Sequence, residues 1–345
     1  TLDEDAKQLG EVVVVAKGSK FSVEKTGAST NISNAQIANM PTVSRSITDI
    51  TRLSPYGGNG MSFAGADGRT ANFTVDGANF NNNFGLSSKL PGGGAPISLD
   101  AIEEMQVVIS PYAVRQTNFV GGGVNAITKS GTNNFKGSAY VYHKNENMRG
   151  DAIEREQISG AREKDQQTTW GFSLGGPIIK NKLFFFANYE NTNKSYPTQY
   201  SFGSEGAKFD SDLAQQILDA YKAWGKTDDG GNYEYNGTWA NKDKSIKSQK
   251  GGLKLDWNIN DKHKATFGWR MVNAKQLNSN STAGYLNASD YQYDFVSKSN
   301  TFTAELNSSF SEKINNQFQA SYVSVRDHRD PKGIAPMIQI KNVGG

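Results

Sequence analysis

The sequence predicts an antiparallel β-barrel that spans a membrane, with a smaller α+β domain ahead of it. Apolar and polar residues alternate over several segments of the second half, for example LKLDWNIN (253–260) and ATFGWRM (265–271). This period of two is typical of strands with one apolar face. Tight turns alternate with long loops between these segments, which is the layout of outer-membrane barrels. No apolar run approaches the ~20 residues that a membrane helix needs.

The overall composition excludes several classes of function. The formal net charge over the 345 residues is only +3, which does not predict a nucleic-acid partner. The chain has no cysteine, and this rules out disulfides, thiolate metal sites and thiol catalysis. No export signal is recognisable at Thr1, so we expect such a signal to have been removed or to lie upstream.

Residues 1–24 form a polar lead-in with one short β-prone run, VVVVA (12–16). Two interpretations of this run stay open. It is either an ordinary edge strand or an exposed strand that a partner adds to its own sheet, in which case backbone hydrogen bonds supply the affinity.

Residues 25–134 predict a compact mixed domain. The segment SRSITDITRLSP (44–55) indicates a short helix with three apolar residues on one face: Ile47, Ile50 and Leu53. Further along, PISLDAIEEM (96–105) predicts one turn of helix, for which Ser98 is the candidate N-cap.

Glycines mark the end of this domain. The segment 102–110 alternates as a strand, and Gly121, Gly122 and Gly123 follow after a loop. We expect these glycines to let the backbone turn and approach other segments closely. VNAIT (124–128) then predicts a second short strand.

Two neighbouring segments of the domain are candidate sites. RTANFTVDG (69–77) predicts a strand that ends where Asp76 and Gly77 turn the chain. The polar segment after it carries aromatic residues that we expect to be exposed, a composition suited to contacting a ligand: Asn79, Phe80, Asn81, Asn82, Asn83 and Phe84.

Residues 135–345 predict about seven strands. Tight turns are expected at 178–182, 259–263 and 311–315, and long loops at about 145–167, 195–247 and 276–296. The second loop is too long for a compact soluble domain and contains a predicted helix at 210–225. Seven strands cannot enclose a separate domain, because barrels that do so have ~22 strands. We therefore expect the chain to be the first part of a longer barrel.

The alternation also assigns side chains to the two faces of the predicted sheet. We expect lipid to contact Trp170, Phe172, Leu255, Trp257, Phe267 and Trp269, and the lumen to be lined by Lys254, Asp256, Arg270 and Glu305. A soluble sandwich would give the same alternation. In that case the apolar set would pack against a second sheet.

The sequence contains no catalytic constellation, so we expect no enzyme activity and no resident cofactor or metal. His143, His263 and His328 are scattered and lack the spacing of metal ligands. A surface loop could bind calcium through Asp228, Asp229 and Asn232, although the spacing is not that of an EF-hand.

Several motifs resemble one family in the same order along the chain. The stretch SPYAVRQTNFVGGGVNAITKSGTN (110–133) resembles the end of the plug domain of TonB-dependent outer-membrane receptors and is most similar to their Oar-like branch. GGPIIKNKLFFFANYE (175–190) resembles the same branch, and LGEVVVVA (9–16) looks like the box that TonB pulls. At the RTANFTVDG position Arg69, Asp76 and Gly77 match the family, but Thr70 stands where it has glycine.

The resemblance implies a transporter in the outer membrane of a Gram-negative bacterium, with membrane lipid and the TonB complex as partners. It divides the chain into a coupling segment (1–24), a plug (25–134) and the start of the barrel (135–345). The TonB-coupling residues would be Leu9, Gly10, Glu11, Val12, Val13, Val14 and Val15. Arg69 either forms an ion pair with the barrel or is an ordinary exposed arginine. The remaining plug positions, Asp76, Gly77, Gly121, Gly122 and Gly123, would be structural.

Other functions stay open at this point. One is a non-transporting receptor or adhesin of the same architecture, and another is a soluble β-rich carbohydrate-binding protein. The related SusC-like branch takes up glycans, but this chain has VVISPYAVRQ (107–116) where that branch carries other motifs. We therefore expect a peptide or protein ligand rather than a glycan.

Overall fold

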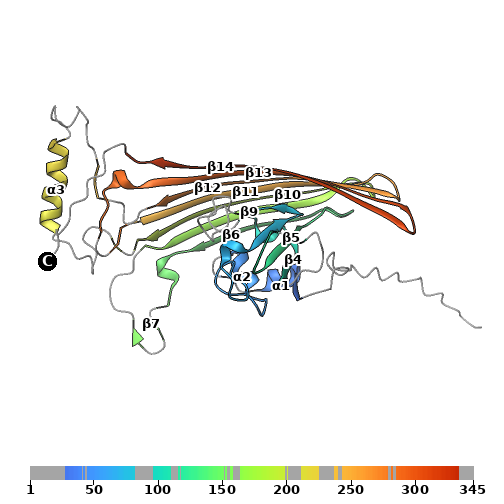
Figure 1. Cartoon of the computed structure of the whole chain (residues 1–345), viewed down its shortest axis with the longest axis horizontal. Coiled ribbons are helices and arrows are strands. Elements are labelled where there is room, and N and C mark those ends of the chain that lie inside the picture. Colours follow the sequence, from blue (N-terminus) through green and yellow to red (C-terminus); the bar gives the residue numbers. More distant parts are fainter. Residues whose placement is uncertain are drawn as a thin grey trace, which may run out of the picture.

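The computed structural model describes residues 28–40, 42, 45–81, 96–109, 116, 118–150, 152–153, 156–157, 164–198, 200, 211–224, 237–239, 243–278, 281–282 and 285–333. These residues form a small five-stranded sheet with short helices and a large seven-stranded sheet (Figure 1). We call the described part of residues 28–128 the small domain and the seven-stranded sheet the wall.

The small domain is built on a mixed sheet in the order β1-β4-β5-β2-β3. β2 and β5 run parallel, and the other neighbours are antiparallel. The strands are β1 (Ser29–Ser33), β2 (Asn72–Val75), β3 (Ala78–Asn79), β4 (Ile102–Val108) and β5 (Gly123–Thr128). The helices are α1 (Asn34–Asn39) and α2 (Ile47–Thr51), with 3₁₀ turns η2 (Gly68–Thr70) and η3 (Leu99–Ala101).

The short helix α2 differs from the sequence-based expectation in one residue. It starts at a capping box formed by Ser46 and Asp49, and Ile47 and Ile50 are fully buried as predicted. Leu53, however, is 44% exposed, because the helix ends at Thr51 and the backbone no longer keeps Leu53 on the core-facing side.

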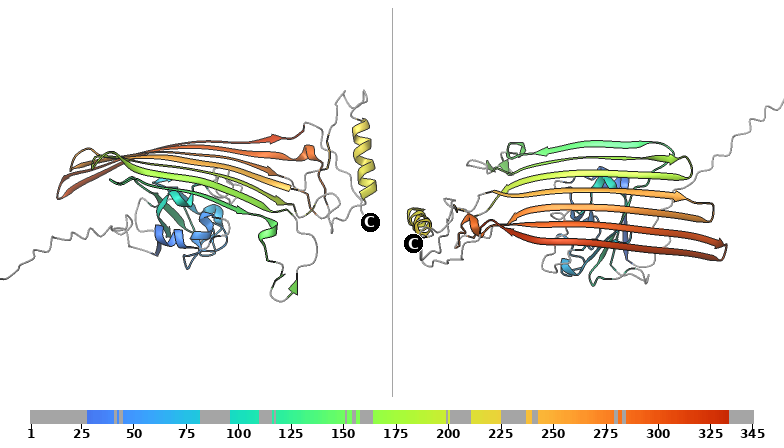
Figure 2. Two further views of the ribbon diagram at one scale, coloured as in Figure 1. Left: turned by 180° about the vertical axis from the view of Figure 1, so that it is seen from behind. Right: turned by 90° about the horizontal axis from the view of Figure 1, so that it is seen from above.

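The wall is an antiparallel meander in which each strand pairs with the next in sequence (Figure 2). Its strands are β6 (Lys136–Lys144), β9 (Gln166–Ile179), β10 (Leu183–Pro197), β11 (Asp243–Asn258), β12 (His263–Asn278), β13 (Tyr293–Ser311) and β14 (Ile314–Pro331). This confirms the seven strands and the three tight turns predicted between them. In the described part of the chain, no helix has the length and apolar character needed to cross a membrane.

The two ends of the wall differ. Tight turns lie at one end, whereas the other carries the long connections (Figure 1). Those connections hold β7 (Ala152–Ile153), β8 (Glu156–Gln157), the helix α3 (Ser211–Trp224), and the 3₁₀ turns η4 (Glu146–Met148) and η6 (Ser289–Tyr291). The helix predicted at 210–225 is therefore present as α3.

The two faces of the wall have the predicted characters. On the outer face, the predicted lipid-facing aromatics are 37–49% exposed: Trp170, Phe172, Trp257, Phe267 and Trp269. They pack against no second sheet within the described residues. Lys254 and Arg270 lie on the opposite face and are buried against the small domain. Register places Asp256 and Glu305 on this inner face too, since both pair with Thr266.

The small domain sits on the inner face of the wall (Figure 1). Part of this contact is apolar, because Phe186 of β10 and Val272 of β12 join the core of the small domain. Both are nearly inaccessible, at 6% and 1% exposure. The rest of the contact is polar and forms the candidate site.

Candidate functional site

The turn between β2 and β3 presents Asp76 to the wall. Val75 pairs with Ala78, so Asp76 and Gly77 form a two-residue hairpin turn. Both have positive φ, 45° and 79°, which such a turn requires and which Asp and Gly tolerate best. The Asp76 carboxylate accepts hydrogen bonds from Thr128 N (2.9 Å) and Thr128 Oγ1 (2.6 Å). These bonds tie the turn to the end of β5.

Two wall cations face this carboxylate. Arg270 forms a close ion pair with Asp76, and Lys254 Nζ lies 3.9 Å from Asp76 Oδ1. Lys254 also donates to Thr128 O (3.0 Å), and Gln319 Nε2 donates to Asp76 O (3.0 Å). The side chains of Asp76, Lys254 and Arg270 are only 13%, 6% and 8% exposed. We call these five residues the Asp76 cluster.

A second polar group joins the small domain to the wall further along the strands. Glu190 of β10 accepts from Lys250 Nζ (2.6 Å), Tyr140 OH (2.8 Å) and Ser98 Oγ (3.0 Å). Ser98 is the only one of the four from the small domain. It is the N-cap of η3, as predicted, since its side chain accepts from Asp100 N. We call Ser98, Tyr140, Glu190 and Lys250 the Glu190 cluster.

Arg45 adds a further contact beside the Glu190 cluster. Its guanidinium carbon lies 4.2 Å from the centre of the Tyr142 ring and 5.2 Å from that of Tyr140, both on β6. It also pairs with Asp100 within the small domain. A cation placed over two aromatic rings of the wall attracts them without a buried counter-charge on the wall.

The polar contacts between the small domain and the wall are made through side chains. Each sheet keeps its own backbone hydrogen-bond ladder, and the polar contacts named above join two side chains or, at Lys254 and Gln319, a side chain and one backbone oxygen. Breaking them exposes two charged clusters that water can solvate. The arrangement therefore suits a domain that is held firmly and can be displaced.

The comparisons with known proteins agree with this architecture. Residues 127–205 match a family model described as an outer membrane beta barrel domain. The TonB-dependent transporter Oar of Myxococcus xanthus is 28% identical over 198 residues, which are 52% of this chain and 18% of that protein. The chain is thus similar to a TonB-dependent outer-membrane transporter. It lies in the outer membrane of a Gram-negative bacterium, and its wall is part of a transmembrane barrel.

Solved structures of such receptors show the same fold. The outer membrane transporter YddB of Escherichia coli superposes with a TM-score of 0.61 at 11% identity, covering 88% of this chain and 40% of that one. The siderophore receptor PirA of Pseudomonas aeruginosa gives 0.54 at 16% identity, covering 89% and 42%. The chain thus spans less than half the length of the relatives it matches.

Arg69 does not reach the wall. It lies in η2 rather than in a strand, because β2 starts only at Asn72. Its side chain is 54% exposed and pairs with Asp67, with Nη2 and Oδ2 2.6 Å apart. The hydrogen bond from the Arg69 side chain holds the pKa of Asp67 at about 2. Of the two interpretations of Arg69, the structure supports the exposed arginine, and an ion pair between the small domain and the wall is made by Asp76 and Arg270.

The predicted ligand-contacting segment is only partly exposed. Asn79 is exposed on β3, but Phe80 is 3% exposed and packs edge-on against Phe73 in the core. Asn81 donates to Asn72 Oδ1 and accepts from Phe73 N, both at 2.7 Å. The expectation of an exposed Phe80 was wrong, since its short hairpin turns that side chain inward. Asn82, Asn83 and Phe84 lie outside the described residues.

The three glycines at the end of the small domain make the close approaches that we expected. A Cβ placed on Gly122 would lie 2.8 Å from the Phe63 ring. One on Gly121 would lie 2.3 Å from Ala66 Cβ, and one on Gly123 would lie 2.8 Å from the Phe119 ring. The predicted coupling residues 9–15 and the candidate calcium ligands Asp228, Asp229 and Asn232 lie outside the residues that the structure describes.

Sequence reasoning missed most of the partners in the two clusters. It placed Lys254 and Arg270 in the lumen but gave them no partner, and it did not single out Glu190, Lys250 or Gln319. A signal was present, because Glu190 and Lys250 are charged residues at inward positions of half-apolar strands. Such positions need a partner when another domain covers them.

Proposed function

We propose that the chain is the plug and first barrel strands of a TonB-dependent transporter that imports a ligand bound by extracellular loops and the outward surface of the small domain. The observation that supports this most is the polar attachment of the small domain to the wall. A plug that must move during transport needs contacts that break without unfolding either part, and the Asp76 and Glu190 clusters are of that kind.

The coupling step follows from strand addition. TonB would capture residues 9–16 as an extra strand, with backbone hydrogen bonds providing the affinity. Tension would then reach the small domain through the connection to β1 and displace it from the wall. The charges of both clusters would become solvated as water enters the path. We propose a peptide or protein as the ligand, because the chain departs from the motifs of the glycan-importing branch.

The coupling segment is tested in the full-length receptor. Deleting residues 9–16 should leave surface binding of a labelled tryptic peptide pool unchanged and abolish its energised accumulation by cells. Val14→Pro should act like the deletion, since proline removes a backbone donor from the added strand. Val14→Ile is the matched control and should keep both activities.

Three outcomes distinguish this proposal from its rivals. Accumulation that survives the deletion contradicts TonB coupling. Surface binding without accumulation in the wild type favours the non-transporting receptor or adhesin. Binding of purified TonB periplasmic domain that is unaffected by Val14→Pro rules out strand capture at this segment.

A further inference from the structure

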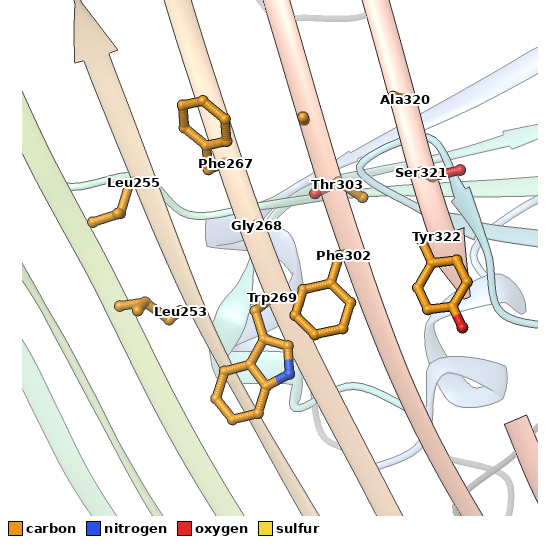
Figure 3. Close-up of a pocket in the computed structure, with 11 residues that line it drawn as sticks. Leu253, Leu255, Phe267, Gly268, Trp269, Phe302, Thr303, Ala320, Ser321 and Tyr322 are labelled. Atoms are coloured by element: carbon orange, nitrogen blue, oxygen red, sulfur yellow. The ribbon is translucent and has the colours of Figure 1, made fainter. Parts of the chain in front are cut away.

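The outer face of the wall carries a shallow apolar groove across β11 to β14 (Figure 3). Its volume is about 440 Å³. The register pairs Phe267 with Ala304 and Ala304 with Ala320, so two small residues follow one large one in the same row. The row beside it is bulky: Leu253, Trp269, Phe302 and Tyr322. The alanines therefore form the floor, and the rings of Phe302 and Tyr322, with centres 6.5 Å apart, form one rim.

Two cations lie on the same face, toward the end with the long connections. Lys298 and Arg326 are directly opposite each other on β13 and β14, and both are exposed. They share the outward side with Phe302 and Tyr322, four residues further along each strand. Like charges directly opposite on one face of a sheet destabilise the pair. An anion between them would remove this repulsion.

Two neighbouring outward side chains, Lys275 and His328, have acidic partners, whereas Lys298 and Arg326 have none in the described part of the chain. Lys275 Nζ lies 2.7 Å from Asp294 Oδ2, and His328 Nε2 lies 3.3 Å from Asp330 Oδ1. Within the described ranges, neither Lys298 nor Arg326 pairs with a carboxylate. Lys298 and Arg326 thus form a cross-strand pair of exposed cations.

The pair lies about as far from the floor of the groove as the edge of a membrane's apolar band lies from its middle. Lys298 lies six residues from Ala304, which is about 20 Å along a strand. For a strand tilted by about 40° this becomes about 15 Å along the membrane normal, just beyond half of an apolar band about 25 Å tall. Between them, Asn300 accepts a hydrogen bond from Trp269 Nε1 (3.3 Å). From the groove toward the long connections, the outer face thus changes from apolar to polar and then to cationic.

We propose that this face is a binding site for a membrane lipid whose phosphate-bearing headgroup has a net negative charge. The phosphate would lie between Lys298 and Arg326, where the planar guanidinium can donate two parallel hydrogen bonds. One acyl chain would follow the strands down into the groove over Ala304 and Ala320. This site faces away from the lumen and is independent of the proposed import of a ligand.

Lipid binding to the full-length receptor in detergent micelles tests the site by native mass spectrometry. The probes are phosphatidylglycerol and phosphatidylcholine with identical acyl chains. We expect the anionic lipid to bind about tenfold more tightly to the wild type, given two cations at the headgroup level. Lys298→Gln with Arg326→Gln should reduce this preference to less than about twofold. Lys298→Arg with Arg326→Lys should preserve the preference for the anionic lipid. This control would show that the preference depends on the two charges and not on a change in the fold.

Two further variants separate the headgroup site from the groove. Ala304→Leu with Ala320→Leu fills the groove and should weaken binding of both lipids while leaving the preference for the anionic one. Lys262→Gln with Lys313→Gln removes the same charge from the tight turns and should change neither. The proposal is wrong if the Lys298/Arg326 double glutamine variant keeps the preference, if this turn control loses it equally, or if neither lipid binds the wild type.

Discussion

Asp76 forms part of the β2–β3 turn and also links the small domain to the wall. Its backbone adopts the left-handed conformation that the β2–β3 turn needs, and its carboxylate accepts from Thr128 while facing Arg270 and Lys254. Asparagine tolerates the same backbone conformation. Asp76→Asn therefore removes the charge and keeps the turn, which makes the ion pair testable without disturbing the hairpin.

We expect Asp76→Asn to lower the free energy of unfolding of the small domain by about 3–5 kcal/mol, because it leaves two buried cations without a counter-charge. Arg270→Gln should lower the free energy of unfolding by a similar amount. The double variant should lose less than the sum of the two, since Arg270 is then no longer a buried cation without its partner and only Lys254 still lacks the Asp76 charge. Urea unfolding in lipid vesicles measures all three, and strict additivity would show that the pair is not coupled.

Arg69→Gln is the matched control for that series. Arg69 and Asp67 form an exposed pair, and such pairs contribute little to stability because water and salt screen the attraction. Its loss should therefore barely change unfolding. A large effect would mean that Arg69 has a structural role beyond its pair with Asp67.

The same exposed pair predicts a pH dependence. The pKa of Asp67 is lowered from 3.8 to about 2, chiefly by the side-chain hydrogen bond from Arg69. The pair therefore contributes stability above pH 3.8, and this contribution is lost as the pH falls through about 2. In a carbon-13 NMR titration of labelled aspartate, Arg69→Gln should move the midpoint of Asp67 back toward 3.8. An unchanged midpoint would assign the shift to another cause.

At the scale of the element, each wall strand separates two environments with a period of two residues. Along β12, Phe267 and Trp269 face outward. Arg270 faces the small domain, and Thr266 lies on the same inner face beside Asp256. Adjacent residues on one strand thus experience lipid and a polar interior. The same substitution should therefore change the stability of the barrel by different amounts at positions one residue apart.

We expect Phe267→Arg to destabilise the barrel by about 2–4 kcal/mol, since the charge then lies near the middle of the lipid-facing band. Thr266→Arg should cost much less, because Asp256 lies on the same inner face and already accepts a hydrogen bond from Thr266 at 3.0 Å. Urea unfolding in lipid vesicles compares the two variants. Equal costs would contradict the assignment of faces.

At the scale of the whole molecule, the meander collects tight turns at one end of the wall and long connections at the other (Figure 1). In outer-membrane barrels the short turns are periplasmic and the long loops extracellular. In the proposed mechanism TonB captures residues 9–16 in the periplasm. This requires that the chain leading into the small domain lies on the same side as the short turns. The direction of the chain is therefore part of the proposed mechanism.

Cysteine labelling measures this orientation directly, since the chain has no cysteine of its own. A membrane-impermeant thiol reagent applied to intact cells should label single cysteines placed at Gly150, Tyr221 and Tyr285. It should not label those placed at Lys180, Asp261 and Lys313 until the outer membrane is permeabilised. The reverse pattern would invert the receptor and contradict the proposed coupling.

The sequence by itself determined the strands, their faces and the tight turns. These are local properties: alternation with a period of two fixes which side chain points to which face, and Gly, Asn and Asp mark the turns. The same local signals correctly identified the Ser98 cap and the turn at Asp76. They could not show that Phe80 turns inward, because that depends on the core beneath β3.

Only the tertiary structure decided which charges meet. Asp76 and Arg270 are 194 positions apart, and Ser98 and Glu190 are 92 apart. No spacing rule relates such residues, because their distance is set by how the small domain sits against the wall. That arrangement follows from the summed burial of Phe186, Val272 and the two clusters. The sequence could therefore predict that inward charges need partners, and the fold alone chose them.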